Sequence, residues 1–158
     1  MTVKKYELVE SDIEGLFRIK ALIDFGNVKT GEIGGYVESE NNLSHLGICW
    51  IFDKACVFDK ACVFDKARVF GEARVFGEAR VFGEACVTEI TTKTPVNIIG
   101  LRYNITITDN HLKAGCQCHD FDYWKNVTEK QLLAMDGNNA VEFYENTLKG
   151  LLEVFCKC

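Results

Sequence analysis

The chain from residue 57 reads Val57-Phe58-Asp59-Lys60-Ala61-Cys62, then Val63-Phe64-Asp65-Lys66-Ala67-Arg68, then Val69-Phe70-Gly71-Glu72-Ala73-Arg74. Further copies of this six-residue unit precede and follow these three. An α-helix returns to the same face about every 3.6 residues, so a period of six would spread Val and Phe around its circumference. A strand returns about every two residues, and six is a multiple of two. The repeat therefore predicts short strands joined by corners.

Alternation within a unit predicts which side chains face inward. The strand is Ala-Cys/Arg-Val, so Ala and Val point one way and the residue between them points the other way. An unpaired Arg cannot lie in an apolar core, so Ala and Val face inward. Asp-Lys or Gly-Glu supplies the corner that leads to the next strand. Three cysteines occupy the Arg position and are predicted to be solvent-facing thiols: Cys56, Cys62 and Cys86.

The pattern of one aliphatic residue, three variable positions and one small residue, repeated every six, resembles the hexapeptide-repeat left-handed β-helix. Known members of that family include acyltransferases and γ-class carbonic anhydrases. The resemblance implies that three units complete one triangular turn. It is also the only reason to predict a left-handed coil, since β crossovers in general are usually right-handed. The predicted fold class is mainly β: a left-handed parallel β-helix with an N-terminal β cap and C-terminal α-helices.

If three units complete a turn, residues 18 positions apart stack across neighbouring strands, about 4.8 Å apart. Three lysines then meet glutamates: Lys54 meets Glu72, Lys60 meets Glu78, and Lys66 meets Glu84. Three phenylalanine pairs also form: Phe52 with Phe70, Phe58 with Phe76, and Phe64 with Phe82. Opposite charges and aromatic pairs both favour this register.

Four segments are predicted along the chain. Residues 1–48 form an N-terminal β cap and a degenerate first turn, because Val37 and Leu43 lie six residues apart. Residues 49–88 are the hexapeptide-repeat segment. Residues 89–126 are a β-rich extension, in which Asp109-Asn110 favours a tight turn. Residues 127–158 are a C-terminal helical element.

Thr128 and Gln131 form a capping-box pattern for a short helix that ends near Met135. The stretch 136–139 (Asp-Gly-Asn-Asn) interrupts the helix. A second helical face follows, and it contains Val141, Tyr144, Leu148, Leu151, Leu152 and Phe155. This face is expected to pack against the side of the repeats. The alternative is an oligomer interface in which this helix packs against the same helix of another copy.

A second resemblance covers most of the chain. It rests on Phe17-Arg18-Ile19-Lys20-Ala21, Gly34-Gly35-Tyr36-Val37-Glu38-Ser39-Glu40 with Asn42-Leu43-Ser44, Trp50, and Thr108-Asp109-Asn110-His111 through Gly115-Cys116. Together these stretches resemble small hexapeptide-repeat proteins encoded by bacteriophages and prophages, a family without a characterised activity. The resemblance implies a phage accessory protein, a class that often counters host defence by binding.

Charge and composition limit the classes of partner that the chain is expected to bind. The formal net charge is −5, and no segment is basic, which argues against binding to duplex nucleic acid. No signal peptide is recognised at the N-terminus, and no apolar stretch reaches the about 18 residues that a membrane span requires. The chain is therefore expected in the host-cell cytoplasm, where its eight cysteines are thiols.

The histidines and cysteines are the candidates for catalysis or metal binding. An acyltransferase needs a histidine base near the repeats, yet none of the three histidines (His45, His111 and His119) lies within residues 51–88. The same histidines suit a γ-carbonic-anhydrase metal site poorly. Cys116, Cys118 and His119, with Cys156 and Cys158, could provide zinc ligands, although paired CxxC spacing is absent. Acidic DNA mimicry is disfavoured because the repeats are neutral overall. No catalytic residue, metal or cofactor is predicted.

Binding without chemistry is the preferred hypothesis. Arginine beside phenylalanine suits phosphate and base recognition. The predicted ligand-binding residues are Arg68, Arg74, Arg80, Arg102, Tyr103, His111, His119 and Trp124. The predicted oligomer interface contains Phe58, Phe64, Phe70, Phe76 and Phe82, and a homotrimer is favoured.

We therefore expect a non-enzymatic phage accessory protein. Its partner is predicted to be either a nucleotide-like defence signal, which it would sequester, or a host defence protein. The alternative is an acyltransferase-like enzyme that uses coenzyme A, with His111 as the best candidate base.

Overall fold

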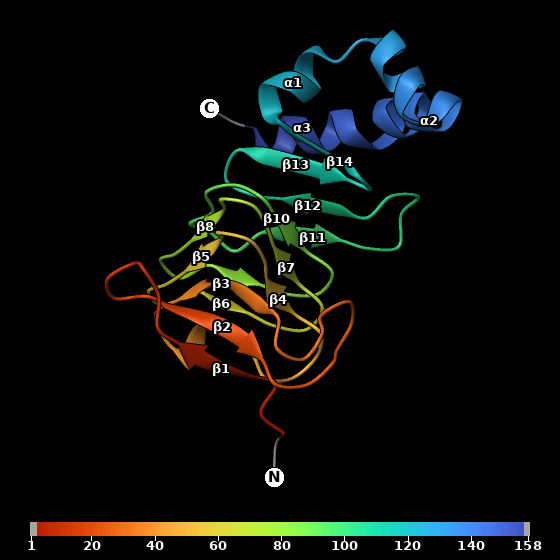
Figure 1. Cartoon of the computed structure of the whole chain (residues 1–158). Helices are drawn as coiled ribbons and strands as arrows, with labels where there is room; N and C mark the ends of the chain where they lie inside the picture. The colour runs from red at the N-terminus through yellow and green to blue at the C-terminus, as the bar shows by residue number, and fades with distance from the viewer. Residues whose placement is uncertain (1–2, 157–158) are drawn as a thin grey trace. The chain divides into compact units, whose positions relative to one another are not determined.

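A computed structural model describes residues 3–156 of the chain (Figure 1). The backbone divides into two compact units, Met1–Asn97 and Ile98–Cys158. The first contains the N-terminal strands and the repeats, and the second contains a small antiparallel sheet and the helices.

The first unit begins with three antiparallel strands: β1 (Tyr6–Val9), β2 (Phe17–Ala21) and β3 (Ile33–Val37). Tyr6 pairs with Ala21 and Val9 pairs with Arg18, so β1 and β2 form an antiparallel hairpin within the predicted N-terminal β segment. A short 3-10 helix, η1 (Glu40–Asn42), follows β3. The predicted alternation is seen in β2, where Ile19 and Ala21 are buried between more exposed neighbours.

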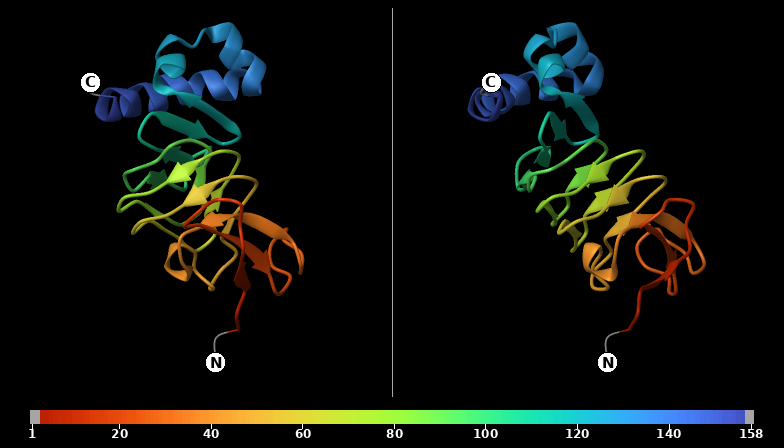
Figure 2. Two further views of the ribbon diagram at one scale, coloured as in Figure 1. Left: turned by 60° about the vertical axis from the view of Figure 1, so that its left-hand side comes forward. Right: turned by 90° about the vertical axis from the view of Figure 1, so that its left-hand side faces the viewer.

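Each repeat forms a strand of only two residues. These strands are β4 (Trp50–Ile51), β5 (Cys56–Val57), β6 (Cys62–Val63), β7 (Arg68–Val69), β8 (Arg74–Val75), β9 (Arg80–Val81) and β10 (Cys86–Val87). Parallel pairs join Cys56 to Arg74 and Cys62 to Arg80, which are 18 positions apart. The predicted 18-residue register is therefore confirmed, and Figure 2 shows these short strands stacked beside one another.

The core of the first unit follows directly from the repeat. The Ala and Val of every unit between residues 55 and 87 are at most 1% exposed, so the inward prediction is confirmed. Each buried Val side chain contributes roughly 1.5–3 kcal/mol relative to an exposed one. Of the predicted solvent-facing thiols, Cys56 and Cys62 are half-buried, whereas Cys86 is only 5% exposed and the prediction is wrong there.

The N-terminal strands join the repeats with a different offset. Val37 pairs with Val57 and Leu43 pairs with Val63, each 20 positions apart. Asn42 is fully buried, and its amide nitrogen donates to the carbonyl oxygen of Ala61 (2.8 Å). Its side-chain oxygen accepts from the backbone of Glu38 and Ser39. The buried amide is thereby satisfied at the point where the repeat spacing changes.

The predicted fold class is wrong. The strands of the described residues form four separate sheets, in the orders β1-β2-β3-β5-β8, β10-β7-β4, β11-β12-β13-β14 and β6-β9. Antiparallel and parallel pairs both occur, and none of the four sheets is a closed or solenoid-like helix. The physical reason is that the repeat covers about 40 residues, while the longer flanking strands pair as antiparallel hairpins. The chain is thus a mixed β structure with C-terminal helices.

The second unit contains the antiparallel strands β12 (Ile105–Ile107), β13 (His111–Ala114) and β14 (Gln117–Asp120). The strand β11 (Val96–Ile98) lies at the division between the two units. The predicted turn at Asp109-Asn110 is confirmed, since the Thr108 amide donates to the His111 carbonyl (2.9 Å) across it.

The helices of the second unit are α1 (Phe121–Asn126), α2 (Glu129–Phe143), the π-helical turn η2 (Tyr144–Leu148) and α3 (Lys149–Phe155). The capping box of Thr128 and Gln131 is confirmed. The predicted interruption is also found, because Asp136 and Gly137 have non-helical backbone angles inside α2. The later apolar face packs within this unit, where the Tyr144 hydroxyl donates to the Trp124 carbonyl (2.7 Å). Among residues 3–156, no helix is long and apolar enough to cross a membrane.

Candidate functional site

The corners of the repeat are built by backbone conformation. Asp53, Asp59 and Asp65 have positive φ angles of 54°, 55° and 59°, and three glycines take the same conformation 18 residues later: Gly71, Gly77 and Gly83. Gly and Asp adopt this region more easily than most residue types, which explains why Asp occupies this position in three consecutive units and Gly in the next three. Each Asp carboxylate accepts the backbone N–H of the stacked Gly, at 3.0, 3.1 and 3.3 Å.

Two glutamates of the repeats, Glu78 and Glu84, face lysines. Lys60 lies 3.5 Å from Glu78, and Lys66 lies 3.6 Å from Glu84. Two of the three predicted Lys–Glu pairs are thereby confirmed, while Lys54 forms no ion pair within residues 3–156. These pairs are exposed, so each contributes only about 0.2–1 kcal/mol.

The arginines of the repeats have a different environment. The guanidinium carbons of Arg68, Arg74 and Arg80 lie 5.5, 5.5 and 5.2 Å from the ring centres of Phe70, Phe58 and Phe64. Within the described residues no carboxylate pairs with these three guanidinium groups. All three arginines are exposed, as predicted for a binding surface. We call these three Arg–Phe contacts the repeat arginine sites.

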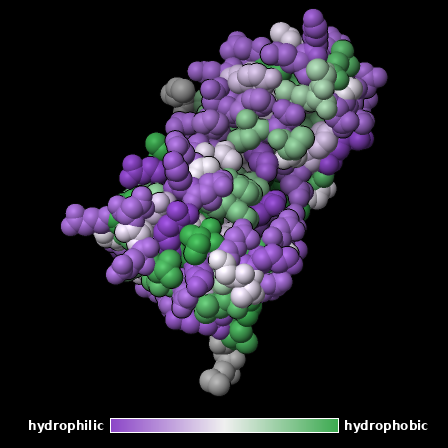
Figure 3. Space-filling view, viewed as in Figure 1, coloured by the Kyte–Doolittle hydropathy of each residue, from purple (hydrophilic) through white to green (hydrophobic). Residues whose placement is uncertain are grey.

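The phenylalanines stack as predicted. Ring centres are 4.7 Å apart for Phe52 and Phe70, 5.1 Å for Phe58 and Phe76, and 5.3 Å for Phe64 and Phe82. Of the predicted interface residues, Phe82 is 38% exposed, while the other four are half-buried. Stacking and the cation–π contacts thus already cover part of each ring. Apolar residues are scattered among hydrophilic ones on the face that Figure 3 presents.

The repeat arginine sites are distributed over three sheets. Arg68 belongs to β7, Arg74 to β8 and Arg80 to β9, and these strands lie in three different sheets. A small ligand bound to one copy would therefore meet one of these guanidinium groups. The sequence predicts these arginines as exposed and on three successive faces of the repeats, and their exposure and their places in three different sheets agree with this.

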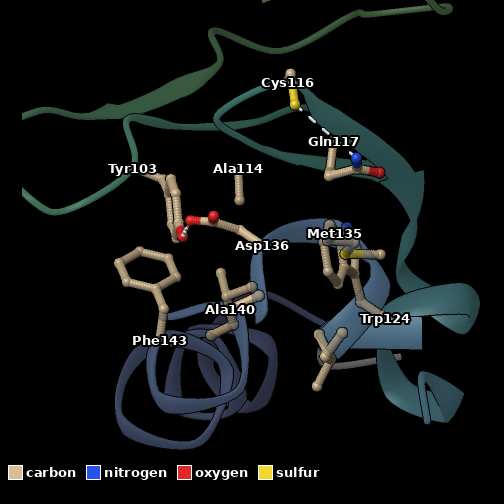
Figure 4. Close-up of a pocket in the computed structure, with 11 residues that line it drawn as sticks. Tyr103, Ala114, Cys116, Gln117, Trp124, Met135, Asp136, Ala140 and Phe143 are labelled. Atoms are coloured by element: carbon tan, nitrogen blue, oxygen red, sulfur yellow. Dashed lines mark hydrogen bonds between the residues drawn. The ribbon is translucent and has the colours of Figure 1, made fainter. Parts of the chain in front are cut away.

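The second unit contains a separate site, a cavity of about 60 Å³. Three aromatic side chains line it: Tyr103, Trp124 and Phe143. Aliphatic side chains and Met135 complete its apolar lining: Ala114, Leu132, Ala140 and Leu148. Figure 4 shows Tyr103 and Phe143 on one side of the space and Met135 and Trp124 on the other. The polar lining consists of Cys116, Gln117 and Asp136.

The aromatic walls of this cavity are held in place. The rings of Tyr103 and Phe143 are 4.9 Å apart and nearly perpendicular, at 85°. The indole N–H of Trp124 donates to the carbonyl oxygen of Leu112 (2.7 Å), and Trp124 is 2% exposed. A buried indole that is hydrogen-bonded in this way has a fixed orientation.

Asp136 points into the cavity from the interruption of α2. Its backbone angles (φ −154°, ψ 39°) are non-helical, and Gly137 has a φ of 57°. Its carboxylate accepts a hydrogen bond from the Tyr103 hydroxyl, as Figure 4 shows. This hydrogen bond is the main cause that raises the pKa of Tyr103, since it stabilises the protonated hydroxyl.

The other predicted ligand residues are only partly brought together. His119 stacks on Tyr123 (3.8 Å between ring centres) and meets the edge of Trp124, and burial lowers its pKa. His111 pairs with Asp120 across the hairpin, and its buried Nδ1 has no hydrogen-bond partner within residues 3–156. Arg102 is exposed. Of this group, Tyr103 and Trp124 alone line the cavity.

Sequence reasoning missed Asp136, Met135 and Phe143 as site residues. The signal for Asp136 was present, because an Asp-Gly pair interrupts a helix there. The zinc hypothesis gains no support from the described residues, which contain no cluster of three or more potential metal ligands. Cys158, one of the proposed ligands, lies outside those residues.

Comparisons with known proteins do not assign a family. No protein-family model matches the chain, and no curated protein matches it at significant similarity. The candidate sites therefore rest on their own geometry.

Proposed function

We propose that the chain is a non-enzymatic binding protein that recognises an anionic partner through its repeat arginine sites. One observation carries this proposal: the Asp residues of the repeats bind Gly N–H groups and two Glu residues face Lys, whereas Arg68, Arg74 and Arg80 contact Phe rings. The three arginines are thus exposed charged groups of the repeats that no carboxylate of the described residues neutralises.

The chemistry of the arginine favours a carboxylate or phosphate. A guanidinium group next to an aromatic ring keeps its N–H edges accessible, and these edges match two oxygens of one anion. The cation–π contact contributes about 0.5–1 kcal/mol at an exposed site and restricts the side chain before binding. Such preorganisation lowers the entropic cost of recognition.

The distribution of the arginines favours repeated contacts over one deep pocket. An extended anionic surface, such as that of an acidic protein, can meet several sites along the repeats. A nucleotide-like ligand needs more than one arginine, which an oligomer would supply by bringing sites of different copies together. A homotrimer, with the exposed edges of the Phe stacks near its contacts, fits this second arrangement.

The phage resemblance gives the proposal a biological setting. We propose that the partner is a host defence protein, or a nucleotide-like defence signal, in the host-cell cytoplasm. Duplex nucleic acid is a poor candidate, because residues 51–87 carry six basic and six acidic side chains.

Native mass spectrometry of protein purified from infected cells tests the proposal, because it reports subunit number and bound molecules together. We expect an assembly that carries an anionic small molecule or an acidic protein. The R68Q/R74Q/R80Q variant should lose that adduct. The matched control K54Q/K60Q/K66Q removes three charges from the same repeats and should keep it.

Other outcomes would reject this function. A bare monomer, or an adduct that the Lys control loses as readily as the Arg variant, contradicts recognition by the repeat arginine sites. Saturable binding of coenzyme A that weakens in His111→Ala would instead support the acyltransferase alternative. One observation favours this alternative: in the described part of the chain, the buried Nδ1 of His111 has no hydrogen-bond partner.

A further inference from the structure

We propose that the cavity of the second unit binds a methylated ammonium group, with Asp136 balancing its charge and the rings of Tyr103, Trp124 and Phe143 surrounding it. This site is independent of the repeat arginine sites, which lie in the other unit and attract the opposite charge. Three features of the cavity support the proposal: its size, its aromatic walls and its single carboxylate.

The size limits the ligand. A cavity of about 60 Å³ exceeds the roughly 10–15 Å³ that a single water needs, so a compact group can enter it. A trimethylammonium group has four heavy atoms and is of this size. A nucleotide is far larger, so the cavity does not serve the nucleotide binding considered for the repeats.

The walls favour a cation with an apolar surface. Aromatic rings attract cations through their quadrupoles, and recognition of quaternary ammonium groups by several rings is well established. Tyr103 and Phe143 form a perpendicular corner, and Trp124 is fixed by its bond to Leu112. Methyl groups also pack well against Met135 and the aliphatic lining, whereas a bare ammonium group would lose strong hydration there.

The carboxylate supplies the charge. Among the described residues that line the cavity, Asp136 alone carries a carboxyl group. Its place in the interruption of α2 directs it toward Tyr103, not along the helix surface (Figure 4). Uncommon backbone conformations are retained where the surrounding structure holds them, and they concentrate at binding sites. Asp136 is an exposed residue, so its carboxylate is accessible to a cationic ligand and would repel an anionic one.

A titration with choline and its neutral isostere 3,3-dimethylbutan-1-ol separates charge from shape. The two tryptophans provide an internal control, because Trp124 lines the cavity and Trp50 is buried in the other unit. We expect choline to shift the indole N–H signal of Trp124 in NMR spectra saturably, without shifting that of Trp50. The neutral isostere should bind at least about tenfold more weakly, as expected when cation–π and carboxylate attraction are both lost.

Variants make the test specific. Asp136→Asn should weaken choline binding about tenfold and leave the affinity for the neutral isostere unchanged. Glu142→Gln, a charge-removing control on the exposed surface of α2, should leave both affinities unchanged. The amide spectrum of each variant reports whether the fold is preserved, and Tyr103→Phe provides a second variant that leaves the Asp136 carboxylate in place.

The proposal is overturned if choline and its isostere bind equally, since the cavity would then be an apolar site without charge recognition. It is also overturned if neither probe shifts the Trp124 signal of the folded wild-type protein. Neither outcome affects the repeat arginine sites, so failure of this inference and failure of the proposed function remain distinguishable.

Discussion

Replacement of Gly71 by alanine tests how the repeat turns its corners. Gly71 has a φ of 64°, and a Cβ atom added there would meet no heavy atom within 4 Å. Its N–H donates to Asp53 (3.0 Å), a bond that alanine also permits. The cost of Gly71→Ala is therefore conformational and not steric.

The magnitude follows from two opposing effects. The left-handed conformation costs a non-glycine residue roughly 1–2 kcal/mol. Alanine also reduces the conformational entropy of the unfolded chain, which stabilises the folded protein by about 0.4–1 kcal/mol. We expect Gly71→Ala to lower the free energy of unfolding by about 1 kcal/mol. Gly71→Asn should cost less than half of this, because asparagine tolerates this conformation, as Asp53 does at the stacked position.

Urea unfolding monitored by the fluorescence of Trp50 measures this difference. A Trp124→Phe background makes Trp50 the sole indole, so the signal reports on the first unit. At a slope of about 2 kcal/mol per molar urea, the alanine variant should unfold about 0.5 M earlier. Gly150→Ala is the matched control, because Gly150 lies in α3 with open space around it. Because Gly150 lies in the second unit, its effect is followed by helical circular dichroism, and the change should stabilise its helix by about 0.5–1 kcal/mol.

Two results would refute the reasoning. If Gly71→Ala is neutral or stabilising, the corner does not depend on a left-handed residue. If Gly71→Asn costs as much as Gly71→Ala, the loss arises from the added side chain and not from its backbone preference. Agreement would explain why Asp and Gly, and no β-branched residue, occupy this position throughout the repeats.

Three further predictions concern stability. Val69→Ala should cost about 2–3 kcal/mol in urea unfolding, because Val69 is fully buried, and a loss below about 1 kcal/mol would contradict a tightly packed core. Asp24 accepts hydrogen bonds from Thr30, which lower its pKa from 3.8 to about 2, so it stabilises the fold above pH 3.8 and loses this effect as pH falls toward 2. The melting temperature of Asp24→Asn should therefore fall less than that of wild type between pH 4 and 2, and equal slopes would exclude the effect. Thr128→Ala should remove the cap of α2 and lower the free energy of unfolding by about 0.5–2 kcal/mol, followed by helical circular dichroism. An unchanged free energy would show that Gln131 alone maintains the helix start.

Local rules succeeded where neighbouring residues decide the structure. The six-residue period predicted the buried Ala and Val positions, because side-chain alternation is a property of any strand. The 18-residue register followed from the resemblance to hexapeptide-repeat proteins, in which three units complete one turn. The capping box at Thr128 and the break at Asp136 were also readable, since both depend on bonds within a few residues.

The fold class and the cavity could not be derived in this way. The repeats of residues 49–88 predicted a parallel β-helix, yet the pairing of β1, β2 and β3 joins antiparallel strands to the parallel ones in a single sheet. Such pairing depends on which edges meet in space. The cavity likewise joins Tyr103 to Asp136 across 33 residues, and no local pattern records that contact.

The sequence by itself determined the corners, the inward valines and the exposed arginines, because each follows from the backbone preference or polarity of single residues at a fixed spacing. Only the tertiary structure decided that the strands fall into four sheets, and that three rings and one carboxylate line a small cavity. The reason is that periodicity specifies which side of a strand a residue occupies, whereas the packing of distant segments specifies which residues share a site.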